Sequence, residues 1–125
     1  MPKDALFWIY CANAALLLVH ELDSVYWKEW DLFRMKGGID LFLVLHIPLC
    51  FAAVAGAALL VQNRPAGNIL SLILCAGGLA APVIHGVFIR KGHPEFRTPL
   101  SISILAGTGL LSLIQAVLTL QRMSG

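Results

Sequence analysis

The chain has 125 residues, of which 58% are hydrophobic and 13% are charged, and its formal net charge is +2. Soluble domains carry about 25% charged residues, so this composition excludes an ordinary soluble domain and indicates a membrane protein. The small net charge argues against a nucleic-acid partner. The three cysteines lie singly in apolar runs, which is typical of small buried residues rather than of a disulfide framework.

Four apolar segments are each long enough to cross a membrane. They cover residues 5–22, 39–62, 68–89 and 100–120, and about 20 residues are needed to cross a hydrocarbon core of about 30 Å. Because a segment in lipid must satisfy its own backbone hydrogen bonds, these segments are predicted to be helices. The sequence therefore predicts an all-α integral membrane four-helix bundle, with residues 1–125 forming a single domain in the lipid bilayer.

The first predicted helix ends in a polar stretch, VHELDSVYWKEWDLF, at residues 19–33. His20 and Asp23 are three residues apart and therefore share a helix face, with Glu21 beside them. The charged residues from Lys28 to Arg34, Glu29 among them, are expected to form a solvated extension along the membrane interface.

The second and third predicted helices each carry a histidine within the apolar span. At a rise of ~1.5 Å per residue, His46 lies roughly 10 Å into the second helix and His85 roughly 6 Å from the end of the third. Pro48 and Pro82 stand close to these histidines, and each removes a backbone donor, which kinks the helix and frees a carbonyl. Both histidines are therefore expected near the membrane face where His20 lies.

The remaining features concern packing. Small residues recur at four-residue spacing in the second, third and fourth helices, and such residues let helices approach closely in lipid. We therefore expect the half of the bundle remote from the histidines to be tightly and apolarly packed. Gln115 in the fourth helix needs a partner, either within the bundle or across the seam of a homodimer. Trp8 and Tyr10 are expected in an interfacial aromatic belt.

Lysine and arginine are unevenly distributed between the two ends of the bundle. The first and third connections hold six of them, and the opposite end holds three. Because short cytoplasmic loops carry the excess of positive residues, we expect these two connections in the cytoplasm and both termini outside it. The expected location is a bacterial inner membrane.

Three histidines from three helices are thus expected at similar depth beside two carboxylates. Ionisable groups within a span usually face the bundle interior or a water-filled cavity. Imidazole and carboxylate together suit zinc, iron, nickel or manganese, so the leading hypothesis is a divalent transition-metal site. Its candidate ligands are His20, Glu21, Asp23, His46 and His85.

Other functions fit the same residues. A histidine beside a carboxylate can move protons, so a metal-free acid–base enzyme acting on a lipid or isoprenoid-like substrate is one alternative. A non-enzymatic accessory or scaffold subunit of a membrane complex is another. In a purely structural interpretation, His20 reaches the lipid headgroups, and His46 is a buried neutral imidazole bonded to a neighbouring carbonyl.

The string His-Glu-x-Asp-x-x-Tyr-Trp-x-Glu-Trp at residues 20–30, together with His46, resembles the signature of a small family of bacterial four-span membrane proteins without an assigned function. The resemblance covers most of the chain and implies the four-span topology. It also implies that His20, Glu21, Asp23 and Glu29 belong to the family's signature. The string YWKEW is similar to one in the sterol-isomerase-like four-span domains, although here it follows the histidine without the intervening residues of that family.

Overall fold

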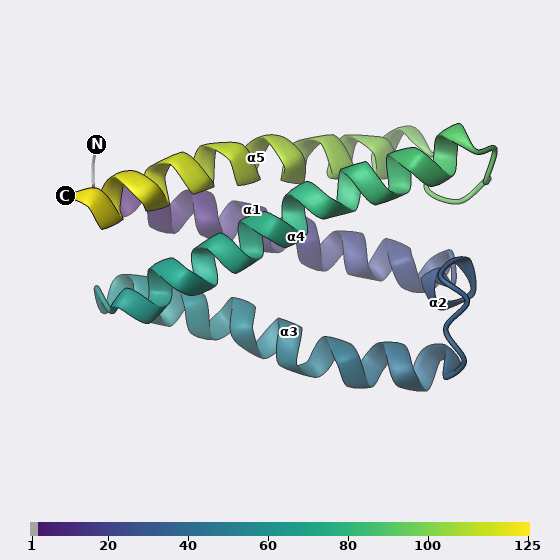
Figure 1. The fold of residues 1–125 in the computed structure, drawn as a ribbon, viewed down its shortest axis with the longest axis horizontal. Helices are drawn as coiled ribbons and strands as arrows, with labels where there is room; N and C mark the ends of the chain where they lie inside the picture. Colours follow the sequence, from purple (N-terminus) through teal and green to yellow (C-terminus); the bar gives the residue numbers. More distant parts are fainter. Residues whose placement is uncertain (1–2) are drawn as a thin grey trace.

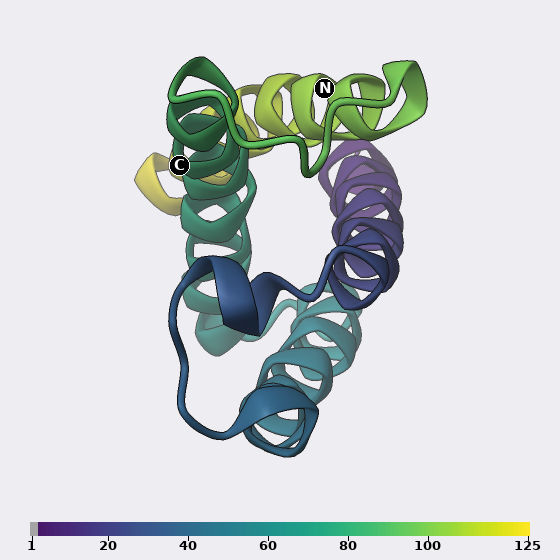
Figure 2. The ribbon, with the colours of Figure 1, turned by 90° about the vertical axis from the view of Figure 1, so that its right-hand side faces the viewer.

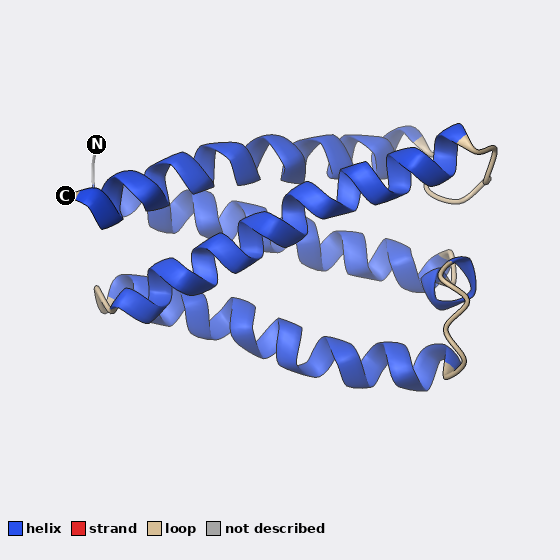
Figure 3. Ribbon diagram, viewed as in Figure 1, coloured by secondary structure: helices blue, strands red, loops and turns tan. Residues whose placement is uncertain are grey.

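The computed structural model describes residues 3–125. Within these residues the chain forms five helices: α1 (Lys3–Tyr26), α2 (Glu29–Leu32), α3 (Gly38–Val61), α4 (Pro65–Arg90) and α5 (Pro99–Ser124). All but the short α2 are long and apolar enough to cross a membrane, and loops and turns connect the helices (Figure 3). The all-α membrane bundle predicted from the sequence is therefore confirmed, and each predicted span coincides with one long helix to within a few residues.

The four long helices run alternately up and down and form a ring. Viewed end-on, the order around the ring is α1, α3, α4 and α5 (Figure 2). α5 packs extensively on α4 and on α1, whereas α3 packs on α4 and contacts α1 more sparsely. The start of α1, the end of α5 and the α3–α4 turn lie together at what we call the terminal end (Figure 1). Residues 27–37 and 91–98 lie at the opposite end, which we call the loop end.

Local sequence signals set the starts of two long helices. α4 and α5 begin with Pro65 and Pro99, at positions where a backbone N–H would have no partner within the helix. Thr98 caps α5, because its side-chain oxygen accepts a hydrogen bond from the Ser101 backbone N–H at 3.0 Å. These signals determine where α4 and α5 begin and keep the connections before them short.

A buried polar network joins α1, α4 and α5. Asn13 Nδ2 donates to Ser112 Oγ and to Gln115 Oε1, both at 2.9 Å, and Thr108 Oγ1 donates to Asn13 Oδ1 at 2.6 Å. Gln115 Nε2 donates to the backbone and hydroxyl oxygens of Ser71. The prediction of purely apolar packing away from the histidines was wrong, because helices in lipid also associate through interhelical hydrogen bonds. Gln115 finds its partners within the chain, which removes the reason for a homodimer seam at this residue.

Tyr10 belongs to the core and not to an interfacial belt, so that prediction was wrong. Its side chain is 1% exposed, and its hydroxyl donates to the Ala53 carbonyl at 2.7 Å. A Cβ at Gly56 would collide with this hydroxyl, so the absence of a side chain on α3 makes room for Tyr10 of α1. Trp8, in contrast, is exposed on the outside of the bundle.

α3 is anchored mainly at the terminal end. Gly56 and Leu60 are buried near its C-terminal end, and Phe42 is buried near its start. From their shared turn, α3 and α4 diverge toward the loop end (Figure 1). Pro48 lies in this divergent half of α3. The divergence determines which polar side chains can meet at the loop end.

Candidate functional site

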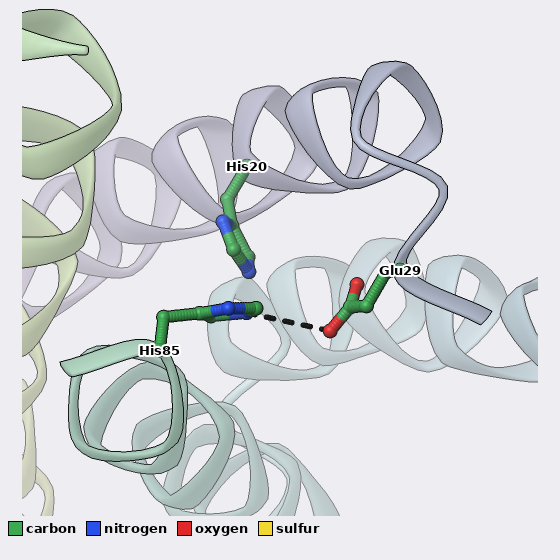
Figure 4. Close-up of side chains that lie close together, drawn as sticks. All are labelled: His20, Glu29 and His85. Carbon is green, nitrogen blue, oxygen red and sulfur yellow. Dashed lines mark ion pairs between the residues drawn. The ribbon is translucent and has the colours of Figure 1, made fainter. Parts of the chain in front are cut away.

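Two buried histidines are in contact near the loop end. His20 of α1 is 3% exposed and His85 of α4 is 2% exposed, and their ring centroids are 4.9 Å apart. Glu29 of α2 points toward them, with its Oε1 3.3 Å from His85 Nε2 (Figure 4). One potential ligand atom from each of the three residues lies within 4.8 Å of the other two. We call these three residues the His–Glu–His cluster.

A sharp turn after α1 brings Glu29 into this cluster. α1 ends at Tyr26, and Lys28 adopts the left-handed conformation, with φ 52° and ψ 58°. The chain therefore leaves the axis of α1 and starts α2 at Glu29, whose side chain is 12% exposed. The prediction that Glu29 belongs to a solvated extension was wrong, because the turn at Lys28 directs its carboxylate inward.

The Glu29 carboxylate is held in its charged form. Burial by itself would raise the pKa of Glu29, but its contact with the His85 imidazole opposes this effect, and the pKa lies below its ordinary value. Near neutral pH the cluster therefore presents one negative charge beside two imidazoles. Such a combination is suited to a cation.

Aromatic side chains cover the cluster. The ring of Phe96, which is 1% exposed, lies 4.0 Å from the His85 ring and 5.6 Å from the His20 ring, measured between centroids. Phe33 lies 6.2 Å from His85, and Trp27 lies 6.4 Å from Phe96. Phe96 has a φ of 63°, which is unusual for a bulky residue, so the surrounding structure holds it there against local strain. The cover limits access of water to the two imidazoles.

Several buried polar atoms in this region have no hydrogen-bond partner within residues 3–125. They are His20 Nδ1, Asp23 Oδ2, Ser24 Oγ, Trp27 Nε1 and His85 Nδ1. Most buried polar atoms in proteins are paired, because an unpaired one is costly. A group of them around one cluster is therefore an unusual feature of this region.

Glu21 and His46 form a second, separate pair. His46 Nε2 lies 2.6 Å from Glu21 Oε2, and His46 Nδ1 lies 2.6 Å from the Phe42 carbonyl oxygen. Because a carbonyl only accepts hydrogen bonds, Nδ1 carries a proton, and one further proton lies between Nε2 and the Glu21 oxygen. The pair is then neutral overall, whichever partner holds that proton. The carbonyl contact expected in the structural interpretation of His46 is present, with Phe42 as the acceptor.

The five residues proposed as ligands from the sequence thus fall into three places. His20 and His85 lie together in the His–Glu–His cluster, and Glu21 and His46 form the second pair. Asp23 lies one helical turn beyond His20, partly exposed, and is not among the three residues whose ligand atoms converge. Two of the three histidines therefore meet, and the third, on the divergent α3, contacts Glu21 instead.

Glu29 is the residue of the cluster that sequence reasoning did not propose as a ligand. Its neighbours Lys28 and Asp31 made the segment look like a solvated, salt-bridged helix. The signal that pointed to Glu29 was its place in the string that starts at His20, which the resemblance already implied to be a signature.

Comparison with curated proteins gives no match, and comparison with solved structures gives none. A family model described as a family of unknown function (DUF6713) matches residues 6–122. This range includes all four long helices in large part, the His–Glu–His cluster and the Glu21–His46 pair. As expected of a chain that resembles a family without an assigned function, this chain belongs to DUF6713, a family of unknown function.

Proposed function

We propose that this protein binds one divalent transition metal ion near the loop end of the bundle, through His20, Glu29 and His85. The observation that carries the proposal is the convergence of three potential ligand atoms within 4.8 Å of one another, from three separate helices. His85 of α4 is far from the other two in the sequence, so its convergence with His20 and Glu29 is a product of the fold. Zinc, iron, nickel and manganese are the candidate metals.

The donor set supports this proposal. Two imidazoles and one carboxylate are the ligands of many catalytic zinc sites and of non-haem iron sites, in which further positions stay open for water or substrate. Around a tetrahedral zinc with bonds of about 2.0–2.2 Å, the ligand atoms are roughly 3.4 Å apart. The cluster needs to contract by at most about 1.5 Å to reach that spacing, which small side-chain rotations supply.

Burial and charge also support the proposal. A divalent cation near a membrane span is costly unless negative groups accompany it. Glu29 supplies one negative charge, and Asp23, with its buried and unpartnered Oδ2, stands one turn from His20. The aromatic cover formed by Phe96 lowers hydration around the site, which strengthens each charge interaction there.

Metal analysis of purified protein tests the proposal. The protein is reconstituted with each of the four metals, and bound metal is measured by plasma mass spectrometry. We expect about one metal per chain in the wild type and at least about tenfold weaker retention in Glu29→Gln and His85→Gln, since each loses a ligand. His93→Gln and Glu95→Gln are the matched controls, because this His–Glu pair, 3.8 Å apart, lies outside the cluster.

The result that refutes the proposal is folded wild-type protein that retains none of the four metals. Equal retention in Glu29→Gln and Glu95→Gln would also refute the ligand assignment. A metal-free acid–base enzyme would instead depend on Glu21 and His46 while holding no metal. A scaffold subunit would keep its partner when either set of residues is replaced.

We also place the loop end in the cytoplasm and the terminal end outside it. The basis is the excess of lysine and arginine in the two connections at the loop end, six residues against three. A metal at the cluster would then be taken from the cytoplasmic pool.

A further inference from the structure

An apolar cavity of about 160 Å³ lies between α1, α3 and α4, and His20, Glu29 and His85 do not line it. Its lining residues on α3 and α4 lie between residues 46 and 53 and between residues 70 and 81, on two helices that diverge toward the loop end (Figure 1). Small residues on all three helices leave the space, among them Ala14, Ala53, Gly77 and Ala81. A Cβ at Gly77 would meet no atom within 4 Å. The cavity is therefore a feature of the helix arrangement and of small side chains on its walls.

The two ends of the cavity differ in chemistry. Toward the terminal end it meets Tyr10 and Ala53, whose mutual hydrogen bond already satisfies the tyrosine hydroxyl. Toward the loop end, Glu21 and His46 line the cavity. Tyr10 and Glu21 are eleven residues apart on α1, which corresponds to roughly 16 Å along the helix axis. The cavity is therefore elongated and has one polar end.

The opening of the cavity faces lipid. Leu18, Leu49 and Ile73 line it, and they are respectively 44%, 57% and 55% exposed on the outside of the bundle. All three lie within membrane-spanning helices. A ligand would therefore enter sideways from the bilayer, and the part of it that does not fit would remain among lipid chains.

The polar end favours a neutral head group. A charged head would bring an additional charge into the membrane span, at high cost. Glu21 contacts His46 through Oε2, and within residues 3–125 its Oε1 has no hydrogen bond. This oxygen can accept a hydrogen bond from a hydroxyl group.

We propose that the cavity binds one chain of a neutral lipid alcohol, whose hydroxyl donates to Glu21 and whose hydrocarbon chain lies between α1, α3 and α4. A cavity of about 150 Å³ holds a six-carbon ring, so this one accommodates about six to eight carbons of a single chain. Lipids with two chains and a large charged head do not match its width or its polar end. This site is additional to the proposed metal centre, because none of His20, Glu29 and His85 lines the cavity.

Photolabelling in phosphatidylcholine nanodiscs tests the proposal. The probe is a sixteen-carbon alcohol with a diazirine in its chain, and the labelled fraction is read by intact-protein mass spectrometry. Two probes of the same chain, one an alkane and one with a trimethylammonium head, measure the head-group preference. We expect the alcohol to label the wild type about fivefold more than either, as one hydrogen bond implies.

Two glycines of α4 provide a matched pair of variants. Gly77→Leu places a side chain in the cavity, whereas Gly86→Leu adds the same side chain at a position where a Cβ also meets nothing within 4 Å but which does not line the cavity. We expect Gly77→Leu to lose the alcohol labelling by about fivefold or more and Gly86→Leu to keep it. Bound metal should be unchanged in Gly77→Leu, so failure of this proposal is distinguishable from failure of the metal site.

Replacing Glu21 at the polar end of the cavity tests head-group binding separately from binding of the hydrocarbon chain. In Glu21→Leu we expect the alcohol and the alkane to label equally, because the chain site remains and the hydrogen-bond acceptor is lost. Equal labelling of Gly77→Leu and Gly86→Leu would overturn the proposal. So would a wild-type preference for the trimethylammonium probe, or equal wild-type labelling by all three probes.

Discussion

α4 and α5 are in close contact at Gly78, and adding one methyl group there should destabilise the bundle. A Cβ at Gly78 would collide with Ser112 Oγ and lie 2.9 Å from Thr108 Oγ1. Both hydroxyls hydrogen-bond Asn13 on α1. Gly78→Ala therefore pushes α5 away and disturbs the network that connects three helices.

The magnitude follows from three contributions. Overpacking a close contact costs about 1–3 kcal/mol. Two weakened interhelical hydrogen bonds, at about 0.6 kcal/mol each in membrane proteins, add about 1 kcal/mol. Alanine is a better helix former than glycine by about 0.5–1 kcal/mol, which offsets part of the loss. The free energy of unfolding of Gly78→Ala should therefore fall by about 2 kcal/mol.

Unfolding by sodium dodecyl sulfate in mixed micelles, followed by tryptophan fluorescence, measures this change. The matched control is Gly77→Ala, one residue away, where a Cβ meets nothing within 4 Å, so stability should stay the same or rise slightly. Adding Ser112→Ala to Gly78→Ala removes the colliding hydroxyl and should recover part of the loss. Equal stability of Gly77→Ala and Gly78→Ala would refute the reasoning.

Three further predictions concern the loop end and the orientation. Lys28→Gly should raise the melting temperature, because glycine adopts the left-handed conformation without the cost of about 1 kcal/mol that lysine incurs. Lys28→Val should lower it, and differential scanning calorimetry of both variants tests the two expectations. Phe96→Ala should speed the reaction of the two buried histidines with diethyl pyrocarbonate, while the partly exposed His93 serves as an internal reference, and unchanged rates would contradict the proposed cover. In a variant without the native cysteines, a cysteine introduced at Lys36 should be shielded from a membrane-impermeant maleimide added outside intact cells, whereas a cysteine at Arg122 should react. The reverse pattern would invert the proposed orientation.

The sequence allowed prediction of the fold class and of the four membrane spans. Long apolar runs determine four helices, because a chain in lipid must satisfy its backbone hydrogen bonds within each segment. Pro65 and Pro99 lay outside the predicted spans, but they begin α4 and α5 because proline is suited to the first turn of a helix. The depth of His20 and His85 near one end of the bundle could be read from their distance along each span.

Only the tertiary structure decided which polar side chains meet. Asn13 and Gln115 are 102 residues apart and bond directly, a pairing that no periodicity within one helix encodes.

The partners at the loop end were likewise decided by geometry between helices. Glu29 joins His20 and His85 because one left-handed residue, Lys28, turns the chain back over the end of the bundle. His46 is a histidine like His20 and His85, and its predicted depth is similar. Because α3 diverges from α4, however, His46 contacts Glu21 instead. Sequence position sets how deep a side chain lies along its own helix, whereas the angles between helices set its distance from side chains on the others.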